Sequence, residues 1–195
     1  MNPNLNLEFE NQIGHHTLLY GDTNTNKTLQ TSEFVKFLLE LKKVPPMEIS
    51  ILDFAPPIMT INNLKVGGKI LDFYEKANDC KNIMFKGEII PPRLKSDNKK
   101  ELYENASKNF QKTSEILNIF NQDPTPILII NDISIHLHIG RIKSLLNAIS
   151  KSDTFFGNTY YGSSIKRGYA TFFSLRERRR VKSLIKKVEL SYFMG

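Results

Sequence analysis

Residues 20–28 read Y-G-D-T-N-T-N-K-T, and this stretch decides the fold of the chain. The apolar run 16–20 comes directly before it, and an amphipathic stretch begins at Lys27. A short apolar run is typical of a strand, whereas the apolar positions after Lys27 recur with the period of a helix. The sequence therefore predicts a strand at 15–20, a tight loop and a helix at 27–43.

The loop nearly matches the phosphate-binding pattern G-x-x-x-x-G-K-[ST] between a strand and a helix. In such a loop, backbone N–H groups surround the α- and β-phosphates at a helix N-terminus, where unpaired N–H groups favour negative charge. Lys27 would reach the β- and γ-phosphates, and the Thr28 hydroxyl would ligate Mg²⁺. The residues that we expect to contact the nucleotide are Gly21, Asp22, Thr23, Asn24, Thr25, Asn26, Lys27 and Thr28.

Asn26 occupies the position where the pattern has its second glycine. That glycine lets the backbone approach phosphate in a conformation that most side chains resist. Asn adopts positive φ more often than other non-glycine residues, so the loop can keep its shape with weakened or altered binding. The alternative is a strand–turn–helix in which the Asn and Thr residues only form the turn and cap the helix.

A second segment, 126–132, reads P-I-L-I-I-N-D and follows the loop by about a hundred residues. A continuous apolar run that ends in a carboxylate is expected of a parallel strand buried on both faces. Together the two segments resemble the P-loop NTPases, whose Walker B strand ends in an aspartate that holds Mg²⁺ through water. The resemblance implies that Asp132, with Thr28, forms the metal site. It covers roughly 17–162 as a fold, but only 21–28 and 127–132 carry specific motifs.

Apolar runs alternate with helical patterns along the chain, which predicts a three-layer α/β sandwich around a mostly parallel sheet. Further strands are expected at 49–54, 83–90, 154–161 and 168–175, and helices at 70–77, 99–121, 142–149 and 178–188. Ligands of such sheets bind at the carboxyl ends of the strands. Four positions should therefore meet at one edge, namely Gly21, Asp53, Asp132 and Asn158.

In P-loop families where a glutamate activates water, it sits directly after the Walker B aspartate or at the end of a neighbouring strand. Ile133 follows Asp132, so the first arrangement is absent. Asp53 ends the strand after the first helix, which resembles the RecA and KaiC-like ATPases. The resemblance implies that Asp53 orients or deprotonates the attacking water while Lys27 stabilises charge on the γ-phosphoryl group. Asp is one methylene shorter than glutamate, and a strand-end turn residue is the alternative interpretation.

The stretch 154–159, T-F-F-G-N-T, resembles the strand that follows Walker B in these ATPases, whose polar tip senses the γ-phosphate. The resemblance makes Asn158 the candidate sensor, and a purely structural role is the alternative. Further along the chain, His136 and His138 would share one face of a strand and could bind one metal. No third ligand with convincing spacing accompanies them, so we favour packing or surface roles for both histidines.

A basic cluster lies near the C-terminus of a chain with net charge +7 and pI near 9.4. Such a cluster attracts phosphate-bearing partners, including nucleic acid, and an arginine in it could complete the site of a neighbouring subunit. A solvated helix face is the alternative. The residues concerned are Arg176, Arg178, Arg179, Arg180 and Lys182.

The composition is that of an ordinary globular protein, with 40% hydrophobic and 24% charged residues in 195. We expect one domain over 1–195, with a polar tail at 1–12 and a basic helix at 176–195. No apolar stretch is long enough for a membrane helix and the start lacks the profile of a signal peptide, which predicts a cytoplasmic protein without a membrane partner. Cys80 is the only cysteine, which excludes an internal disulfide.

These features predict an ATP-binding protein with Mg²⁺-dependent hydrolysis, coupled to a partner or to self-assembly in a homo-oligomer. One alternative is a small-molecule or nucleotide kinase in which Arg93 and the segment 59–98 cover an acceptor. The other is a nucleotide-binding interaction module without catalysis, which would explain Asn26 and the missing glutamate. No N/TKxD-type guanine-reading motif is visible, so ATP is expected rather than GTP.

Overall fold

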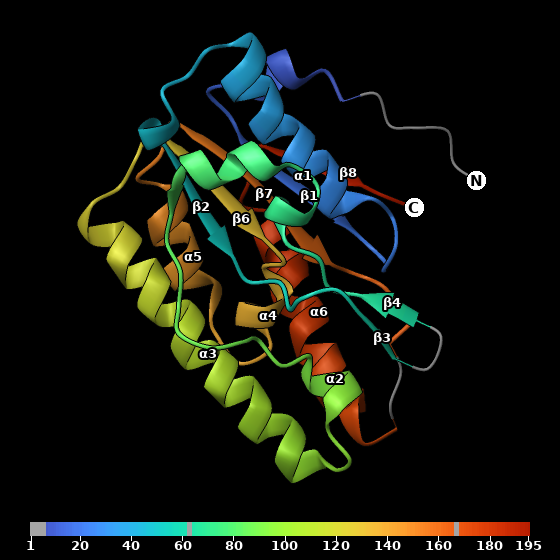
Figure 1. Ribbon diagram of the computed structural model, residues 1–195. Helices are drawn as coiled ribbons and strands as arrows, with labels where there is room; N and C mark the ends of the chain where they lie inside the picture. Colours follow the sequence, from blue (N-terminus) through green and yellow to red (C-terminus); the bar gives the residue numbers. More distant parts are fainter. Residues whose placement is uncertain (1–6, 62–63, 166–167) are drawn as a thin grey trace.

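One six-stranded sheet, in the order β5-β2-β6-β7-β1-β8, forms the centre of the molecule (Figure 1). The computed structural model describes residues 7–61, 64–165 and 168–195. Neighbouring strands of this sheet pair in parallel. The strands are β1 (His16–Gly21), β2 (Ile49–Asp53), β5 (Lys81–Asn82), β6 (Ile127–Asn131), β7 (Thr154–Tyr160) and β8 (Leu190–Phe193). The expected α/β fold with a parallel central sheet is confirmed.

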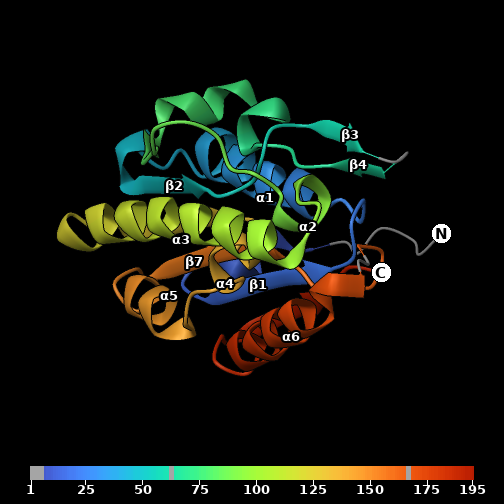
Figure 2. The same ribbon diagram turned by 90° about the horizontal axis from the view of Figure 1, so that it is seen from below.

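Helices cover both faces of this sheet, so the molecule has three layers. The helices are α1 (Lys27–Lys36), α2 (Pro92–Lys95), α3 (Lys99–Gln122), α4 (Ser134–Leu137), α5 (Ile142–Ile149) and α6 (Thr171–Ile185). Short 3₁₀ turns cover Phe9–Gln12, Pro46–Glu48, Ile70–Asp72, Glu75–Asp79 and Gly168–Ala170, and a π-helical turn over Phe37–Leu41 extends α1. Figure 2 shows α1 on one side of β1 and β7, with α5 and α6 on the other.

Side chains of each buried strand alternate between two cores, because successive residues of a strand point to opposite faces. In β6, Ile129 packs in the core under α1, whereas Leu128 and Ile130 pack in the core under α3, α5 and α6. Helix α1 is held by Phe34, whose ring stacks on that of Phe156 with centroids 4.3 Å apart. Aromatic pairs of this kind contribute about 0.5–1.5 kcal/mol beyond area burial. This contact packs the last turn of α1 against the first half of β7.

The chain reverses its direction of winding between β1 and β7, which are neighbours in the sheet. From β1 the chain passes through α1 on one face and returns in β2, beyond β7 and β6. From β7 it passes through α6 on the other face and returns in β8, beyond β1. Open parallel sheets bind ligands outside the carboxyl ends of strands at such a switch point. The loop after Gly21 lies there.

Two predicted strands are wrong. The stretch 83–90 contains no strand, and the only pairing nearby is the two-residue β5. The stretch 168–175 is helical instead, and α6 begins at Thr171. The aromatic residues of 168–175 suggested a strand, but the buried positions of α6 follow the helical period. These positions are Phe173, Glu177, Val181 and Leu184. Glu177 interrupts that apolar stripe in the sequence and concealed it.

The C-terminal segment 176–195 is likewise more than the basic helix that was predicted, since it also contains β8, parallel to β1. A hairpin that the sequence did not predict is formed by β3 (Met59–Ile61) and β4 (Leu64–Val66), which pair antiparallel. The predicted helix at 70–77 is replaced by two 3₁₀ turns, whereas the one predicted at 99–121 is confirmed by α3. Within the described residues, every helix is too short or too polar to cross a lipid bilayer.

Candidate functional site

The loop from Gly21 to Thr28 leads from the carboxyl end of β1 into the first turn of α1. Asn24 and Asn26 have φ angles of 57° and 58°, so both adopt the left-handed conformation. Asn26 thus takes the positive φ for which asparagine is the best side-chain-bearing substitute for glycine. Residues in alternating right- and left-handed conformations turn their N–H groups toward one concave side, where anions bind.

Lys27 lies folded into this loop. Its ammonium group donates to the carbonyl oxygen of Asp22 and to Oγ1 of Thr25, the latter at 3.0 Å. Burial lowers the pKa of Lys27 to about 8, although the nearby carboxylates of Asp132 and Asp22 favour the charged form. Lys27 is therefore a half-buried cation whose hydrogen-bond partners are neutral oxygen atoms.

Asn131, the last residue of β6, has the side chain that meets the loop. Its Oδ1 accepts from Oγ1 of Thr28 at 3.2 Å and from Nδ2 of Asn158 at 2.8 Å. Asn158 also donates to Oγ1 of Thr31 in α1 at 2.9 Å. Asn131 and Asn158 are almost completely buried. These bonds join the start of α1 to the ends of β6 and β7 beneath it.

Asn131 was not predicted from the sequence, which placed Asp132 with Thr28 at the metal site. Alternation along β6 explains the difference, because Ile129 and Asn131 face α1 while Ile130 faces the opposite core. Counting alternate residues along the apolar run would have identified Asn131, had it been known which face of the sheet α1 covers.

Asp132 follows the strand and lies in the pocket instead. Its φ of 52° is in the left-handed region, which is uncommon for a residue other than glycine and is frequent at functional sites. Its backbone N–H donates to Oδ1 of Asn158 at 3.1 Å, and its Oδ1 accepts from Ser134 at 2.7 Å. Burial raises the pKa of Asp132, while the Ser134 hydroxyl and the charges of Lys27 and Arg93 oppose this shift.

Asp53 belongs to the same hydrogen-bond network but binds mainly to the segment after β2. Its carboxylate accepts from the backbone N–H groups of Ala55 at 3.1 Å and Ile70 at 2.7 Å, and from Nδ2 of Asn131 at 2.8 Å. Burial raises the pKa of Asp53. Asp53 is not among the described residues that line the pocket. Its three bonds tie the segment after β2 to the sheet, and its predicted role as the base stays a prediction that this position does not favour.

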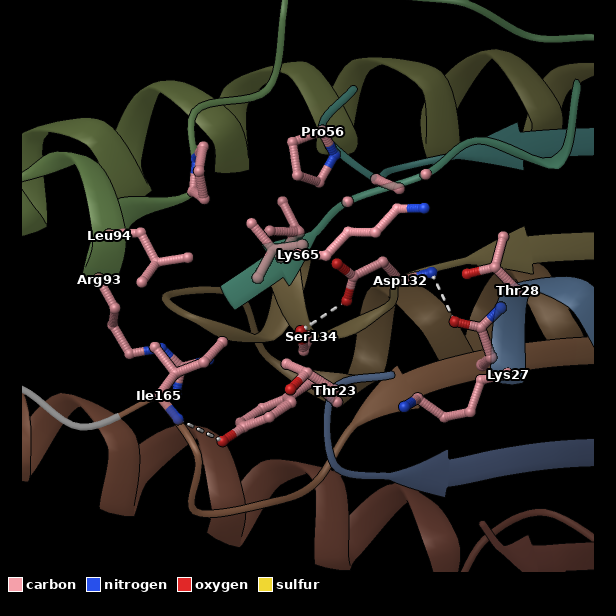
Figure 3. Close-up of a pocket in the computed structure, with 18 of the residues that line it drawn as sticks. Thr23, Lys27, Thr28, Pro56, Lys65, Arg93, Leu94, Asp132, Ser134 and Ile165 are labelled. Atoms are coloured by element: carbon pink, nitrogen blue, oxygen red, sulfur yellow. Dashed lines mark hydrogen bonds between the residues drawn. The ribbon is translucent and has the colours of Figure 1, made fainter. Parts of the chain in front are cut away.

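A pocket of about 130 Å³ lies outside the carboxyl ends of the strands. Lys27 and Thr28 line one end of it and Arg93 lines the other, with Asp132 between them (Figure 3). The β4 segment and the prolines before α2 form the remaining wall. Three of the four positions that were predicted to meet, Asp53, Asp132 and Asn158, are joined directly or through Asn131, and Gly21 begins the loop.

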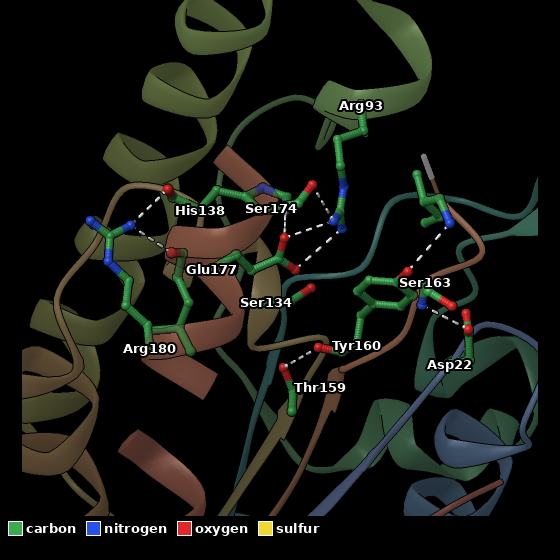
Figure 4. A network of polar contacts seen from close by, with 12 residues as sticks. Asp22, Arg93, Ser134, His138, Thr159, Tyr160, Ser163, Ser174, Glu177 and Arg180 are labelled. Carbon is green, nitrogen blue, oxygen red and sulfur yellow. Dashed lines mark hydrogen bonds and ion pairs between the residues drawn. The ribbon is translucent and has the colours of Figure 1, made fainter. Parts of the chain in front are cut away.

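Arg93 is held by a buried ion pair. Its Nη1 lies 2.8 Å from Oε2 of Glu177 in α6, and its guanidinium stacks 4.8 Å from the ring centre of Tyr160 (Figure 4). Nε2 of His138 lies 3.6 Å from the same Glu177 oxygen. Burial raises the pKa of Glu177 to about 7 even though Arg93 favours its charged form. Burial also holds the pKa of His138 well below its usual value.

The basic cluster does not act as one surface patch. Arg180 donates to the carbonyl oxygens of Leu137 and His138 at 2.8 and 2.7 Å, and so closes α4 onto α6. Arg178 stacks 4.8 Å above the ring of Tyr161. The members that remain exposed to solvent without such a stacking or backbone role are Arg176, Arg179 and Lys182.

His136 and His138 lie in and after the helical turn α4 rather than on a strand. The ring of His136 contacts Oγ1 of Thr113 and Oγ of Ser144, both at 2.9 Å. In the described part of the chain, no group of three His, Cys, Asp or Glu residues could hold a metal ion. These contacts agree with the packing role that the sequence favoured for His136.

The loop and strand ends nevertheless suit a hard cation with a polyphosphate. Thr28 and Asp132 line the pocket with hydroxyl and carboxylate oxygen atoms, which are ligand types that Mg²⁺ binds. The N-terminus of α1 and the ammonium of Lys27 suit the phosphates. No protein-family model and no curated protein sequence matches this chain.

Proposed function

We propose that the chain binds Mg²⁺-ATP at the loop Gly21–Thr28 and hydrolyses its terminal phosphate. One observation carries the proposal: Lys27 and Thr28 from this loop line a single pocket with Asp132, at the point where the sheet reverses its winding. Phosphates bind at such helix N-termini, and the fold-level likeness to P-loop NTPases gives the same expectation.

Lys27 would exchange its two neutral partners for phosphate oxygens. A charge-assisted bond to an anion is roughly twice as strong as a bond between neutral groups, so the exchange is favourable. The contacts of Lys27 with Asp22 and Thr25 keep the ammonium inside the loop until a phosphate arrives.

Thr28 would hold Mg²⁺ through its hydroxyl, and Asn131 would position that hydroxyl, from which its Oδ1 accepts at 3.2 Å. When bound, Mg²⁺ neutralises charge on the β- and γ-phosphates. Asn131 itself is fully buried and is not among the described residues that line the pocket, so it would act on the metal only through Thr28. A neutral hydroxyl attracts the cation less than a carboxylate does, so we expect a modest affinity for Mg²⁺ alone.

Asp132 then occupies the position directly after the residue at the strand end. In this proposal it is the base, in place of Asp53, because it lines the pocket and carries a raised pKa. The carboxylate of Asp132 accepts a proton from water as the water oxygen bonds to the γ-phosphorus. The bond to the β–γ bridging oxygen breaks, and ADP leaves with its electron pair.

Calorimetry with Mg²⁺-ATP, together with phosphate release, tests this function in the wild type, Lys27→Ala and Asp132→Asn. Lys36→Ala, on the same helix and outside the pocket, is the matched control. We expect Lys27→Ala to lose binding, Asp132→Asn to bind without turnover, and the control to resemble the wild type. Equal heat and equal rates in wild type and Lys27→Ala would refute the proposal.

The same measurements separate the alternatives. Binding without turnover in the wild type would support a non-catalytic nucleotide-binding module. Coupling to self-assembly would appear as a rate per chain that rises with protein concentration, which follows from mass action.

A further inference from the structure

A second hollow of about 420 Å³ adjoins the pocket at the phosphate loop. The two hollows share Arg93, Tyr160 and Ile165 in their linings. We call the second hollow the α6 groove, because the start of α6 forms one of its walls. Other residues that line it are Tyr161, Ser163, Ser174, Leu175, Glu177 and Arg178.

The α6 groove combines cations with aromatic rings. Arg93 stacks on Tyr160 at its inner end, and Arg178 stacks on Tyr161 nearer to solvent. Glu177 is buried and bound to Arg93, so it offsets one of the two positive charges and leaves the other for an anion. Guanidinium groups bind carboxylate and phosphate in a planar, two-pronged manner.

The size and the lining of the groove are those of a small-molecule site. Such sites are clefts of several hundred cubic ångströms with mostly apolar walls and a few converging polar groups. Leu175, Ile165 and the two tyrosine rings supply the apolar walls. The hydroxyl of Ser174 lies beside Arg93 and accepts from its Nη1 at 3.5 Å. Water alone, as the second substrate of hydrolysis, needs no space of this kind.

We propose that the α6 groove binds a ring-bearing organic anion, and that Arg93 couples its occupancy to the phosphate loop. The anion would lie against Arg178 and its ring against the tyrosines, where stacking is favourable. Arg93 lines both hollows and its charge acts on Asp132 as well as on Glu177. The coupling rests on the proposed function of the loop, whereas the binding itself does not.

Calorimetry without ATP tests the binding, with AMP and benzoate as charged ring probes and adenosine and inorganic phosphate as probes that lack the charge or the ring. At least one charged ring probe should bind with Kd below about 1 mM, and the incomplete probes about tenfold more weakly. The same measurement in Lys27→Ala removes any contribution from the phosphate loop, and the affinity should persist there. If neither charged ring probe binds in that variant, the proposal is wrong.

Two pairs of variants locate the site. Leu175→Trp fills the groove and Arg178→Ala removes its outer cation, so each should weaken the probe about tenfold. Phe172→Trp and Arg179→Ala make the same changes on the same helix outside the lining and should leave the affinity unchanged. Equal losses in a variant and its control would place the probe elsewhere and overturn the proposal.

Coupling is a separate measurement. Saturating Mg²⁺-ATP should change the Kd of the probe, and the probe should change the Kd of Mg²⁺-ATP by the same factor, because coupling free energy is reciprocal. Arg93→Lys, which keeps the charge but not the planar fork, should reduce that factor. A probe that binds in the groove with no effect of Mg²⁺-ATP, in a chain that does bind Mg²⁺-ATP, would refute the coupling alone.

Discussion

Nδ2 of Asn131 donates to Oδ1 of Asp53 at 2.8 Å, across the paired ends of β6 and β2. The oxygen of the same carboxamide accepts from Thr28 and Asn158. One buried amide thus satisfies a carboxylate on one side and two donors on the other. A carboxylate at residue 131 would satisfy the donors but would meet Asp53 with like charge.

Asn131→Asp tests this balance through stability. The variant places two buried carboxylates at hydrogen-bond distance, and we expect the free energy of unfolding near pH 7 to fall by about 2–4 kcal/mol. One of the two carboxyl groups then has a raised pKa, so the lost stability should return as pH falls below that pKa. Urea unfolding at pH 5 and pH 8 measures both effects.

The combined variant Asp53→Asn with Asn131→Asp is its control, since it restores one amide and one carboxylate to the pair. We expect it to recover part of the loss, as contacting residues couple in double-mutant cycles. Strict additivity of the two single changes would mean that the bond contributes nothing.

The pKa of Lys27, lowered to about 8, predicts a pH-dependent affinity for Mg²⁺-ATP. The ammonium must be charged to bind phosphate, and below about pH 8 it already is. As pH rises further, binding must take up a proton, so the Kd should increase by up to about tenfold per pH unit. Calorimetry in buffers of different ionisation enthalpy measures that uptake. Lys27→Arg remains charged throughout and should show a flat profile; a flat wild-type profile from pH 7 to 9.5 would contradict the prediction.

Asn26→Gly should strengthen nucleotide binding. Glycine adopts the observed φ of 58° without steric cost and lets phosphate approach the backbone, whereas Asn26→Ala should be less stable than the glycine variant by about 1 kcal/mol. Lys43 has a φ of 56° outside the pocket, so Lys43→Gly is the matched control. It should shift stability in the same direction and leave the Kd unchanged. Identical Kd values for Asn26→Gly and wild type would show that residue 26 does not limit the approach of phosphate.

The Arg93–Glu177 ion pair predicts a large loss of stability when one partner is removed. Arg93→Leu leaves a buried carboxylate without its cation, which costs about 3–5 kcal/mol, and adding Glu177→Leu should recover much of that loss. Lys76→Leu breaks the exposed pair with Glu40 and should leave the stability almost unchanged, because exposed ion pairs contribute little. Thermal and urea unfolding of the variants measure these differences. A double variant no more stable than Arg93→Leu alone would contradict the prediction.

Local signals in the sequence predicted the elements that carry the site. The apolar run 126–132 and the helical stripe after Lys27 both gave correct elements, because buried parallel strands and amphipathic helices each impose a pattern on consecutive residues. The conformation of Asn26 also agrees with the sequence argument, since positive φ is a property of a single residue. By contrast, the edge strand β8 and the short β5 carry little pattern of their own.

The sequence by itself determined the fold class, the loop between β1 and α1, and the strand ends that border the pocket, since these depend on neighbours along the chain. Only the tertiary structure decided that Asn131, rather than Asp132, meets Thr28, because this depends on which face of β6 is covered by α1. It also brought Arg93 to Glu177, 84 positions away, because a buried charge needs an oppositely charged partner. Contacts between distant segments depend on how layers pack, and no local periodicity encodes that packing.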